Sequence, residues 1–261
     1  MIDCLYRRLP SDGDFQVFES TDGTRSNWDP EIQHGSPPLA LMTKLIEEHA
    51  AGSALRVGRL TLDILGAIPV VPLRVRAWTL RPGARIAMMC AEMLPVGAER
   101  PVARVTAWLL ATSDTSDVAT DRHPPLGKGD PVANPHAWLG APGYLETVTW
   151  HRQETPPGAA AEVWMSPLVP LVDAEPVTET QRLAMVVDSA NGVGASLNPN
   201  EFLFMNTDTT VHLHRVPSGD EFALRARASI GPDGVGVTTA DLFDHRGFVG
   251  TSAQTLLVLR R

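Results

Sequence analysis

The amino-acid sequence contains the same order of elements twice: a helical segment followed by several strands in which apolar and polar residues alternate. The first copy begins near Ser36 and the second near Thr178. A chain of 261 residues is long enough to bury two cores of ordinary domain size. The sequence therefore predicts two equivalent folding units of roughly 120 residues each.

The first helical segment has clear signals at both ends. Ser36 can cap its N-terminus, Pro37 suits the first helical position, and Gly52 follows its C-terminus. In the strand after it, Leu60 and Leu62 alternate with polar residues, the pattern of a sheet with one solvated face. Four strands are expected after the helix, over residues 55–65, 70–80, 86–94 and 101–112.

The second helical segment, residues 179–197, carries a carboxylate among apolar residues. Asp188 belongs to a stripe of small and polar residues beside a broad apolar face, and Thr178 can cap the helix. Because small and polar residues let a ligand approach closely, the second unit is expected to carry the chemistry. Strands are expected before this helix over 144–152 and 161–166, and after it over 206–216, 221–230, 235–243 and 248–259.

The stretch over residues 113–142 is rich in Asp, Pro and Gly and has no sustained periodicity, as is typical of a linker. We therefore expect an N-terminal unit over residues 1–115, a linker over 116–140 and a C-terminal unit over 141–261. A helix that is apolar over most of its circumference fits a curved antiparallel sheet, so the order of elements predicts an α+β fold.

Charge and composition argue against several classes of protein. The formal net charge of -8 disfavours a nucleic-acid partner, and no apolar run is long enough to span a membrane. The N-terminus lacks the pattern of a secretion signal, so a cytoplasmic location is expected. Cys4 and Cys90 have no paired spacing and are expected to be reduced thiols. His212 and His214 share a strand face but lack a third ligand, so neither a metal nor a cofactor is expected.

Four segments of the sequence resemble the double-hotdog acyl-CoA thioesterases of the TesB type: HGSPPLALMTKLIEEH, VVDSANGVGASL, NTDTTVHLHR and GTSAQTLLV. The resemblance extends over residues 14–258. It implies a double hotdog, with two antiparallel sheets that each wrap around a long helix and join into one continuous sheet. A tandem chain can make this pairing internally, which leaves a homodimer or a higher homo-oligomer optional.

The resemblance also implies a catalytic set. In the family this set is an Asp on the second helix, a Thr or Ser at the start of the next strand shortly before a His-Arg pair, and a Gln on the last strand. By position, these residues correspond to Asp188, Asn206 and Gln254. Asn206 departs from the pattern, so either its amide replaces the hydroxyl, or the neighbouring Thr207 supplies one, or the activity is reduced or absent. Asp188 would activate a water that Asn206 and Gln254 orient.

The predicted substrate is an acyl-CoA, hydrolysed to a free fatty acid and CoA. His34 is expected to line the pocket, and backbone N–H groups near Gly35 and Ser36 are expected to bind the oxyanion at the start of the first helix. No GxSxG elbow is present, which disfavours a serine hydrolase. The alternative is a catalytically weak or inactive protein of the same fold that binds acyl-CoA or an acyl chain. A tunnel for the acyl chain is expected between the two helices, lined by Met42, Ile46, Met185 and Phe204.

Overall fold

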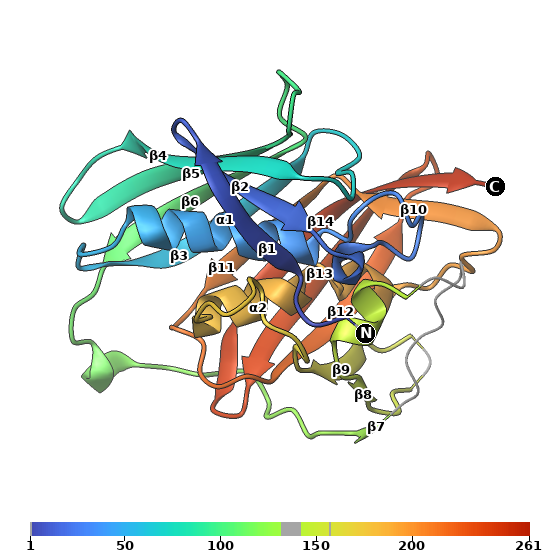
Figure 1. Cartoon of the computed structure of the whole chain (residues 1–261). Coiled ribbons are helices and arrows are strands. Elements are labelled where there is room, and N and C mark those ends of the chain that lie inside the picture. The colour runs from blue at the N-terminus through green and yellow to red at the C-terminus, as the bar shows by residue number, and fades with distance from the viewer. Residues whose placement is uncertain (1, 132–141, 157) are drawn as a thin grey trace.

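The computed structural model describes residues 2–131, 142–156 and 158–261 of the chain. In these ranges fourteen strands form one sheet, in which all neighbouring strands are antiparallel (Figure 1). The order across the sheet is β1-β2-β4-β5-β6-β3-β11-β14-β13-β12-β9-β8-β7, and β10 also pairs with β14.

The N-terminal half contains the expected helix and four strands after it. These are α1 (Ser36–His49), β3 (Leu55–Ile64), β4 (Leu73–Arg81), β5 (Ile86–Pro95) and β6 (Ala103–Ala111). Gly35, rather than Ser36, is the N-cap residue, and Pro37 follows within the first turn. Every residue of α1 from its start through Ile46 is buried, because the helix packs on β4, β5, β6 and a second helix.

A hairpin that the sequence analysis did not predict precedes α1. It consists of β1 (Tyr6–Asp12) and β2 (Phe15–Ser20), and β2 pairs with β4 through Gln16 and Val75. Gly13 forms the turn with a φ of 59°, a backbone conformation that glycine adopts readily. Only Tyr6 of β1 is buried, so this strand lacks the apolar alternation that would have marked it in the sequence.

The C-terminal half has two departures from the expected elements. The segment predicted as a strand over 144–152 begins as a short 3-10 helix (Tyr144–Thr147) and only ends as a strand, β8 (His151–Arg152). The helix predicted over 179–197 is divided into α2 (Glu179–Val187) and α3 (Ala190–Gly194). Thr178 caps α2 as expected, since its hydroxyl accepts a hydrogen bond from the Gln181 backbone N–H.

Among the remaining strands of this half, five agree with strands expected from the sequence, whereas the two-residue strand within the predicted linker and the strand directly after α3 were not expected. These remaining strands are β7 (Asp130–Pro131), β9 (Ala161–Met165), β10 (Phe202–Asn206), β11 (Asp208–Leu213), β12 (Phe222–Ile230), β13 (Val235–Asp244) and β14 (Gly247–Arg260). The strand predicted over 206–216 corresponds to β11, whereas β10, which ends at Asn206, lies over residues that were not predicted as a strand. Residues 132–140 of the predicted linker lie outside the described residues.

The two halves meet at β3 and β11, where Leu62 pairs with Thr209 and Leu60 with Val211. On one face of the sheet, α1 also packs directly against α2 (Figure 1). Apolar residues of both halves therefore belong to one hydrophobic core. None of the helices in the described ranges has the length and apolar character needed to cross a bilayer.

Candidate functional site

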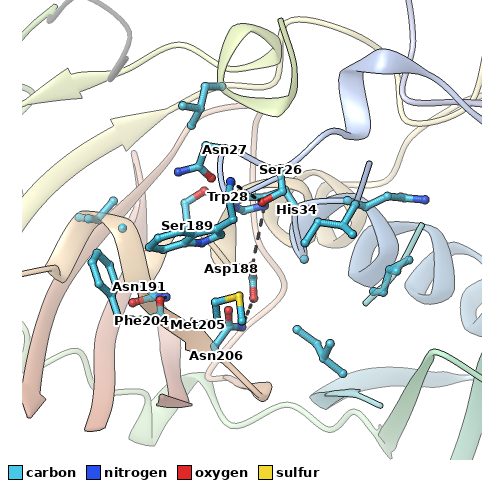
Figure 2. A pocket seen from close by; sticks show the side chains of 18 of the residues that line it. Ser26, Asn27, Trp28, His34, Asp188, Ser189, Asn191, Phe204, Met205 and Asn206 are labelled. Atoms are coloured by element: carbon cyan, nitrogen blue, oxygen red, sulfur yellow. Dashed lines mark hydrogen bonds and ion pairs between the residues drawn. The ribbon is translucent and has the colours of Figure 1, made fainter. Parts of the chain in front are cut away.

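A cavity of about 320 Å³ lies where the start of α1 meets the break between α2 and α3 (Figure 2). Its wall combines a loop of the N-terminal half, the helix break of the C-terminal half and strand β10. Both halves are therefore needed to form it. The lining residues used below are Trp28, Ile32, His34, Gly35, Asp188, Ser189, Phe204, Met205 and Asn206.

The hydroxyl of Tyr144 fixes the helix break that exposes Asp188 to the cavity. This hydroxyl donates a hydrogen bond to the backbone carbonyl of Met185 at 2.8 Å. In a continuous helix that carbonyl would accept the backbone N–H of Ser189, which instead bonds to the carbonyl of Val186 at 3.1 Å. The inserted side chain thus tightens the turn at Asp188 and ends α2 there.

Three side chains hold one oxygen of the Asp188 carboxylate. Oδ1 accepts hydrogen bonds from Asn206 Nδ2 at 2.7 Å, from Gln254 Nε2 at 3.1 Å and from the Thr209 hydroxyl. The same two amide groups donate to Thr209 Oγ1, at 3.2 Å and 3.0 Å. The hydroxyl therefore uses its single donor and both acceptor positions, and the network fixes the carboxylate in one orientation.

The second carboxylate oxygen, Oδ2, faces the start of α1. No described residue donates a hydrogen bond to it. Its nearest partners are His34, whose Nδ1 is 3.8 Å away, and Gly35 (Figure 2 shows the His34 and Asn206 contacts). A Cβ atom at Gly35 would lie 2.5 Å from Oδ2, so the absence of a side chain there lets the carboxylate reach this position.

His34 is held as a neutral ring. The backbone N–H of Ser36 donates to its Nδ1 at 3.1 Å, so in the neutral ring the proton is on Nε2. The ring stacks on Tyr144 with 3.9 Å between the ring centroids and an interplanar angle of 11°. Burial lowers the pKa of His34, an effect that the negative charge of Asp188 opposes but does not outweigh. His34 therefore offers a neutral N–H donor at the cavity wall.

The predicted catalytic residues do not all come together. Asp188, Asn206 and Gln254 meet in one network, whereas the exposed Thr207 bonds to Asp208 Oδ1 at 3.3 Å and to the Thr255 carbonyl at 3.4 Å. Both amides donate to the carboxylate and to Thr209, a residue that the sequence analysis did not single out.

Of the predicted substrate-binding residues, His34, Gly35 and Phe204 line the cavity. The expected tunnel between the helices is absent from this cavity, because α1 and α2 pack directly against each other and bury the side chains between them. The Ser36 backbone N–H is also already bonded to His34. The predicted residues that do not line the cavity are Ser36, Met42, Ile46 and Met185.

The cysteines lie outside this site. Cys4 and Cys90 are buried and unpaired, and burial raises the pKa of each thiol to about 11. Neither therefore forms an appreciable amount of thiolate at neutral pH. In the part of the chain that the structure describes, no three His, Cys, Asp or Glu side chains are grouped so that they could hold a metal ion.

Two family models match the sequence, one in each half. The model of the acyl-CoA thioesterase N-terminal domain matches residues 24–110, and the model of the acyl-CoA thioesterase C-terminal domain matches residues 121–258. The second range contains Asp188, Thr209 and Gln254. No curated protein matches the sequence.

Solved structures with the hotdog fold are similar to this chain over nearly its whole length. A conserved protein of unknown function from Alicyclobacillus acidocaldarius has a TM-score of 0.74 at 15% identity, covering 96% of this chain and 95% of its own. The acyl-CoA thioesterase II of Mycobacterium marinum has a TM-score of 0.69 at 13% identity, covering 97% and 96%. At such low identity these similarities establish the hotdog fold alone.

Proposed function

The chain belongs to the acyl-CoA thioesterase family and is a thioester hydrolase, and we propose that it hydrolyses a fatty acyl-CoA to free acid and CoA with a water activated by Asp188. The observation that carries this proposal is the asymmetry of the carboxylate. Oδ1 accepts three hydrogen bonds, whereas Oδ2 receives none from a described residue and lies beside His34 and Gly35, and Asp188 lines the cavity. A general base needs one fixed and accessible oxygen of this kind.

In the proposed reaction Asp188 Oδ2 takes a proton from a water, and the water oxygen attacks the carbonyl carbon of the thioester. Negative charge then develops on the carbonyl oxygen. When the intermediate collapses, the carbon–sulfur bond breaks and the proton held by Asp188 passes to the departing sulfur. The products are a carboxylic acid and CoA thiol, so the reaction consumes one water and no other reactant.

His34 Nε2–H is the donor we assign to the developing oxyanion. The Ser36 N–H, which lies at the positive end of α1, already bonds to His34 Nδ1 and polarises the ring toward the cavity. A neutral imidazole that carries its proton on Nε2 can then stabilise negative charge on the substrate carbonyl. Asn206, Thr209 and Gln254 act through the carboxylate that they hold, as positioning residues.

Binding without hydrolysis was the alternative, and it depended on the replacement of the family's hydroxyl residue by Asn206. The Thr209 hydroxyl bonds to the Asp188 carboxylate, which supports hydrolysis although Asn206 stands in place of the family's hydroxyl residue. Hydrolysis is therefore the function that the geometry supports better.

The test is thiol release from short, medium and long acyl-CoAs by the wild-type protein and by Asp188→Asn. The variant keeps the size of the side chain but loses the base, so we expect kcat to fall by roughly 10² to 10⁴. Asp233→Asn, an exposed residue of the turn between β12 and β13, is the matched control and should retain wild-type kcat. Near-normal turnover by Asp188→Asn would reject its role as base. Thermal stabilisation of the wild-type protein by acyl-CoA without any thiol release would support the binding-only alternative.

A further inference from the structure

A second hollow of about 430 Å³ opens next to the catalytic cavity. The two share Trp28, Ile32 and Met205 in their linings, so the hollow continues the cavity toward the protein surface. Its lining includes residues of β10 and of the C-terminal end of β14, two strands that pair with each other. We refer to it as the outer groove; the rest of its lining is Asp29, Leu203, Leu259, Arg260 and Arg261.

Two arginines give the outer groove a positive charge. The Arg260 guanidinium lies over the ring of Phe202 with 4.8 Å to the centroid, and that of Arg261 lies over Trp28 with 5.8 Å. Both side chains are exposed, and neither forms an ion pair with a carboxylate of the described residues. Aromatic rings thus orient both guanidinium groups while their donors stay open to a ligand.

This local charge is opposite in sign to that of the whole chain. The formal net charge is -8, and the groove contains one acidic residue, Asp29, against two arginines. The two guanidinium groups would attract an anionic ligand to the groove. Guanidinium groups bind phosphate oxygens well, because their planar fork can donate two parallel hydrogen bonds.

The strand register gives the separation between this charge and the catalytic carboxylate. On β10 and β14, Asn206 is opposite Leu256 and Phe202 is opposite Arg260. Asn206, which bonds to Asp188, and Phe202, which contacts Arg260, are four residues apart on β10. This spacing places the groove about 13 Å from the catalytic carboxylate. The extended pantetheine arm of CoA, which joins the sulfur to the diphosphate, is long enough to cover this distance.

We propose that the outer groove binds the phosphate groups of the CoA moiety through Arg260 and Arg261. The inference rests on the proposed hydrolysis at Asp188, since that reaction fixes where the sulfur of the substrate lies. The acyl chain and thioester then occupy the inner cavity, and the pantetheine arm passes Met205 and Trp28 to the groove. The arginines supply affinity for CoA thioesters and take no part in the bond-breaking steps.

The experiment compares two substrates with the same acyl group, one on CoA and one on pantetheine, which has no phosphate. In the double variant Arg260→Gln/Arg261→Gln we expect KM for acyl-CoA to rise roughly tenfold with kcat unchanged, as two lost exposed charge contacts imply. KM for acyl-pantetheine should change by less than about twofold, because no charge contact is lost. The rise in KM for acyl-CoA with added salt should also become shallower.

The matched control is the double variant Arg85→Gln/Arg246→Gln, which removes the same charge from two exposed sites. Arg246 precedes β14 at the end opposite Arg260, and Arg85 precedes β5 in the other half. This control should leave KM for acyl-CoA near that of the wild-type protein. An equal rise for both substrates in the test variant, or no rise for either, would overturn the proposal.

Binding of free CoA, measured by calorimetry, separates this inference from the proposed reaction. We expect the test variant to bind CoA roughly tenfold more weakly than the wild-type protein and the control variant to bind it normally. If the wild-type protein binds CoA through the two arginines but hydrolyses no thioester, the proposed binding in the outer groove is supported and the proposed hydrolysis is rejected. Hydrolysis of acyl-CoA with CoA binding unaffected by the two arginines would reject the groove alone.

Discussion

Gly35 and Asp188 are in contact although they belong to different halves of the chain. A Cβ atom at Gly35 would lie 2.5 Å from Asp188 Oδ2 and 2.9 Å from Oδ1. The backbone of Gly35 has a φ of -70°, which any residue can adopt, so the position requires glycine for space and not for backbone freedom. The N-terminal half thus sets the position of the carboxylate that the C-terminal half provides.

Gly35→Ala should therefore lower activity without unfolding the protein. The added methyl group must push the carboxylate away from its position, and we expect kcat to fall by roughly 10² because a shift of about 1 Å has such an effect. Gly192→Ala is the control, since Gly192 also lines the cavity but has no atom within 4 Å of an added Cβ. Steady-state kinetics with one acyl-CoA would compare them; equal kcat values for the two variants would contradict the explanation.

Thr209 and Thr207 form a natural pair for testing which hydroxyl supports the reaction. Thr209→Val keeps the shape but removes the hydrogen bond to Asp188 Oδ1, and the Asn206 and Gln254 amides lose one of their acceptors. We expect kcat to fall by roughly 10 to 10², and Thr209→Ser to recover most of the loss. Thr207→Val should be neutral, because the Thr207 hydroxyl is exposed and bonds to Asp208 and Thr255 instead of Asp188. The reverse ranking of the two valine variants would restore Thr207 as the hydroxyl residue.

His34→Phe tests the assigned oxyanion donor. The ring can still stack on Tyr144, but the Nε2–H is lost, and we expect kcat to fall by roughly 10² to 10³ with a smaller change in KM. His34→Gln offers an amide donor and should recover part of the activity. Nitrogen NMR of the wild-type imidazole should find the proton on Nε2. Protonation of Nδ1 instead, or wild-type kcat in His34→Phe, would count against the assignment.

The lowered pKa of His34 predicts how the rate depends on pH. Burial favours the neutral ring, so His34 stays neutral at pH values where an exposed histidine becomes charged. Between about pH 8 and pH 6.5, the dependence of kcat on pH should therefore be the same in the wild-type protein and in His34→Gln. A step in this range that is present in the wild-type protein and absent from the variant would mean that His34 titrates there.

Glu175 links the two halves by charge and predicts a pH-dependent stability. Its carboxylate is 2.6 Å from Arg8 Nε and 3.0 Å from Lys44 Nζ, and chiefly the Arg8 hydrogen bond lowers its pKa to about 2, from an ordinary value of 4.5. A lowered pKa stabilises the fold above the unfolded value, and this contribution is lost as the pH falls from 4.5 toward 2.

Glu175→Gln should therefore lower the free energy of unfolding at neutral pH by roughly 1 to 2 kcal/mol. The difference from the wild-type protein should shrink steadily as the pH falls below about 4.5. Urea unfolding at several pH values measures both quantities. Glu19→Gln is the control, since Glu19 is half exposed and 3.7 Å from Arg7, and it should change stability little at any pH. A difference that is independent of pH would argue against the ion pairs as its source.

Most of the strands and both helix starts could be predicted from the sequence, because their signals are local. Pro37 at the start of α1 and the capping box of Thr178 with Gln181 depend only on neighbouring residues. The break at Asp188 could not be predicted in this way. It depends on the hydroxyl of Tyr144, 41 residues from Met185 in the chain, which takes the carbonyl that would have continued the helix.

The catalytic network was predicted in part. Gln254 and Asp188 were identified by resemblance, whereas Thr209 was overlooked in favour of the residues at the start of the expected strand. A signal for it was present: Thr209, Val211 and Leu213 alternate with more exposed neighbours in β11 and are all buried. A hydroxyl on the buried face of that strand was thus the better candidate. The residues expected to line a tunnel between the helices are buried where α1 packs against α2, because apolar spacing alone does not distinguish a packed core from a binding site.

The place of β14 in the sheet has a consequence for biosynthesis. This strand follows all the other described strands in the chain, yet it lies between β11 and β13 and carries Gln254. A nascent chain on the ribosome can assemble every earlier strand and still lack both a central partner for β11 and one donor to Asp188. Only when β14 is in place can the enzyme turn over substrate and are the edges of β11 and β13 both paired. A product that is truncated before β14 would therefore be inactive and prone to aggregate.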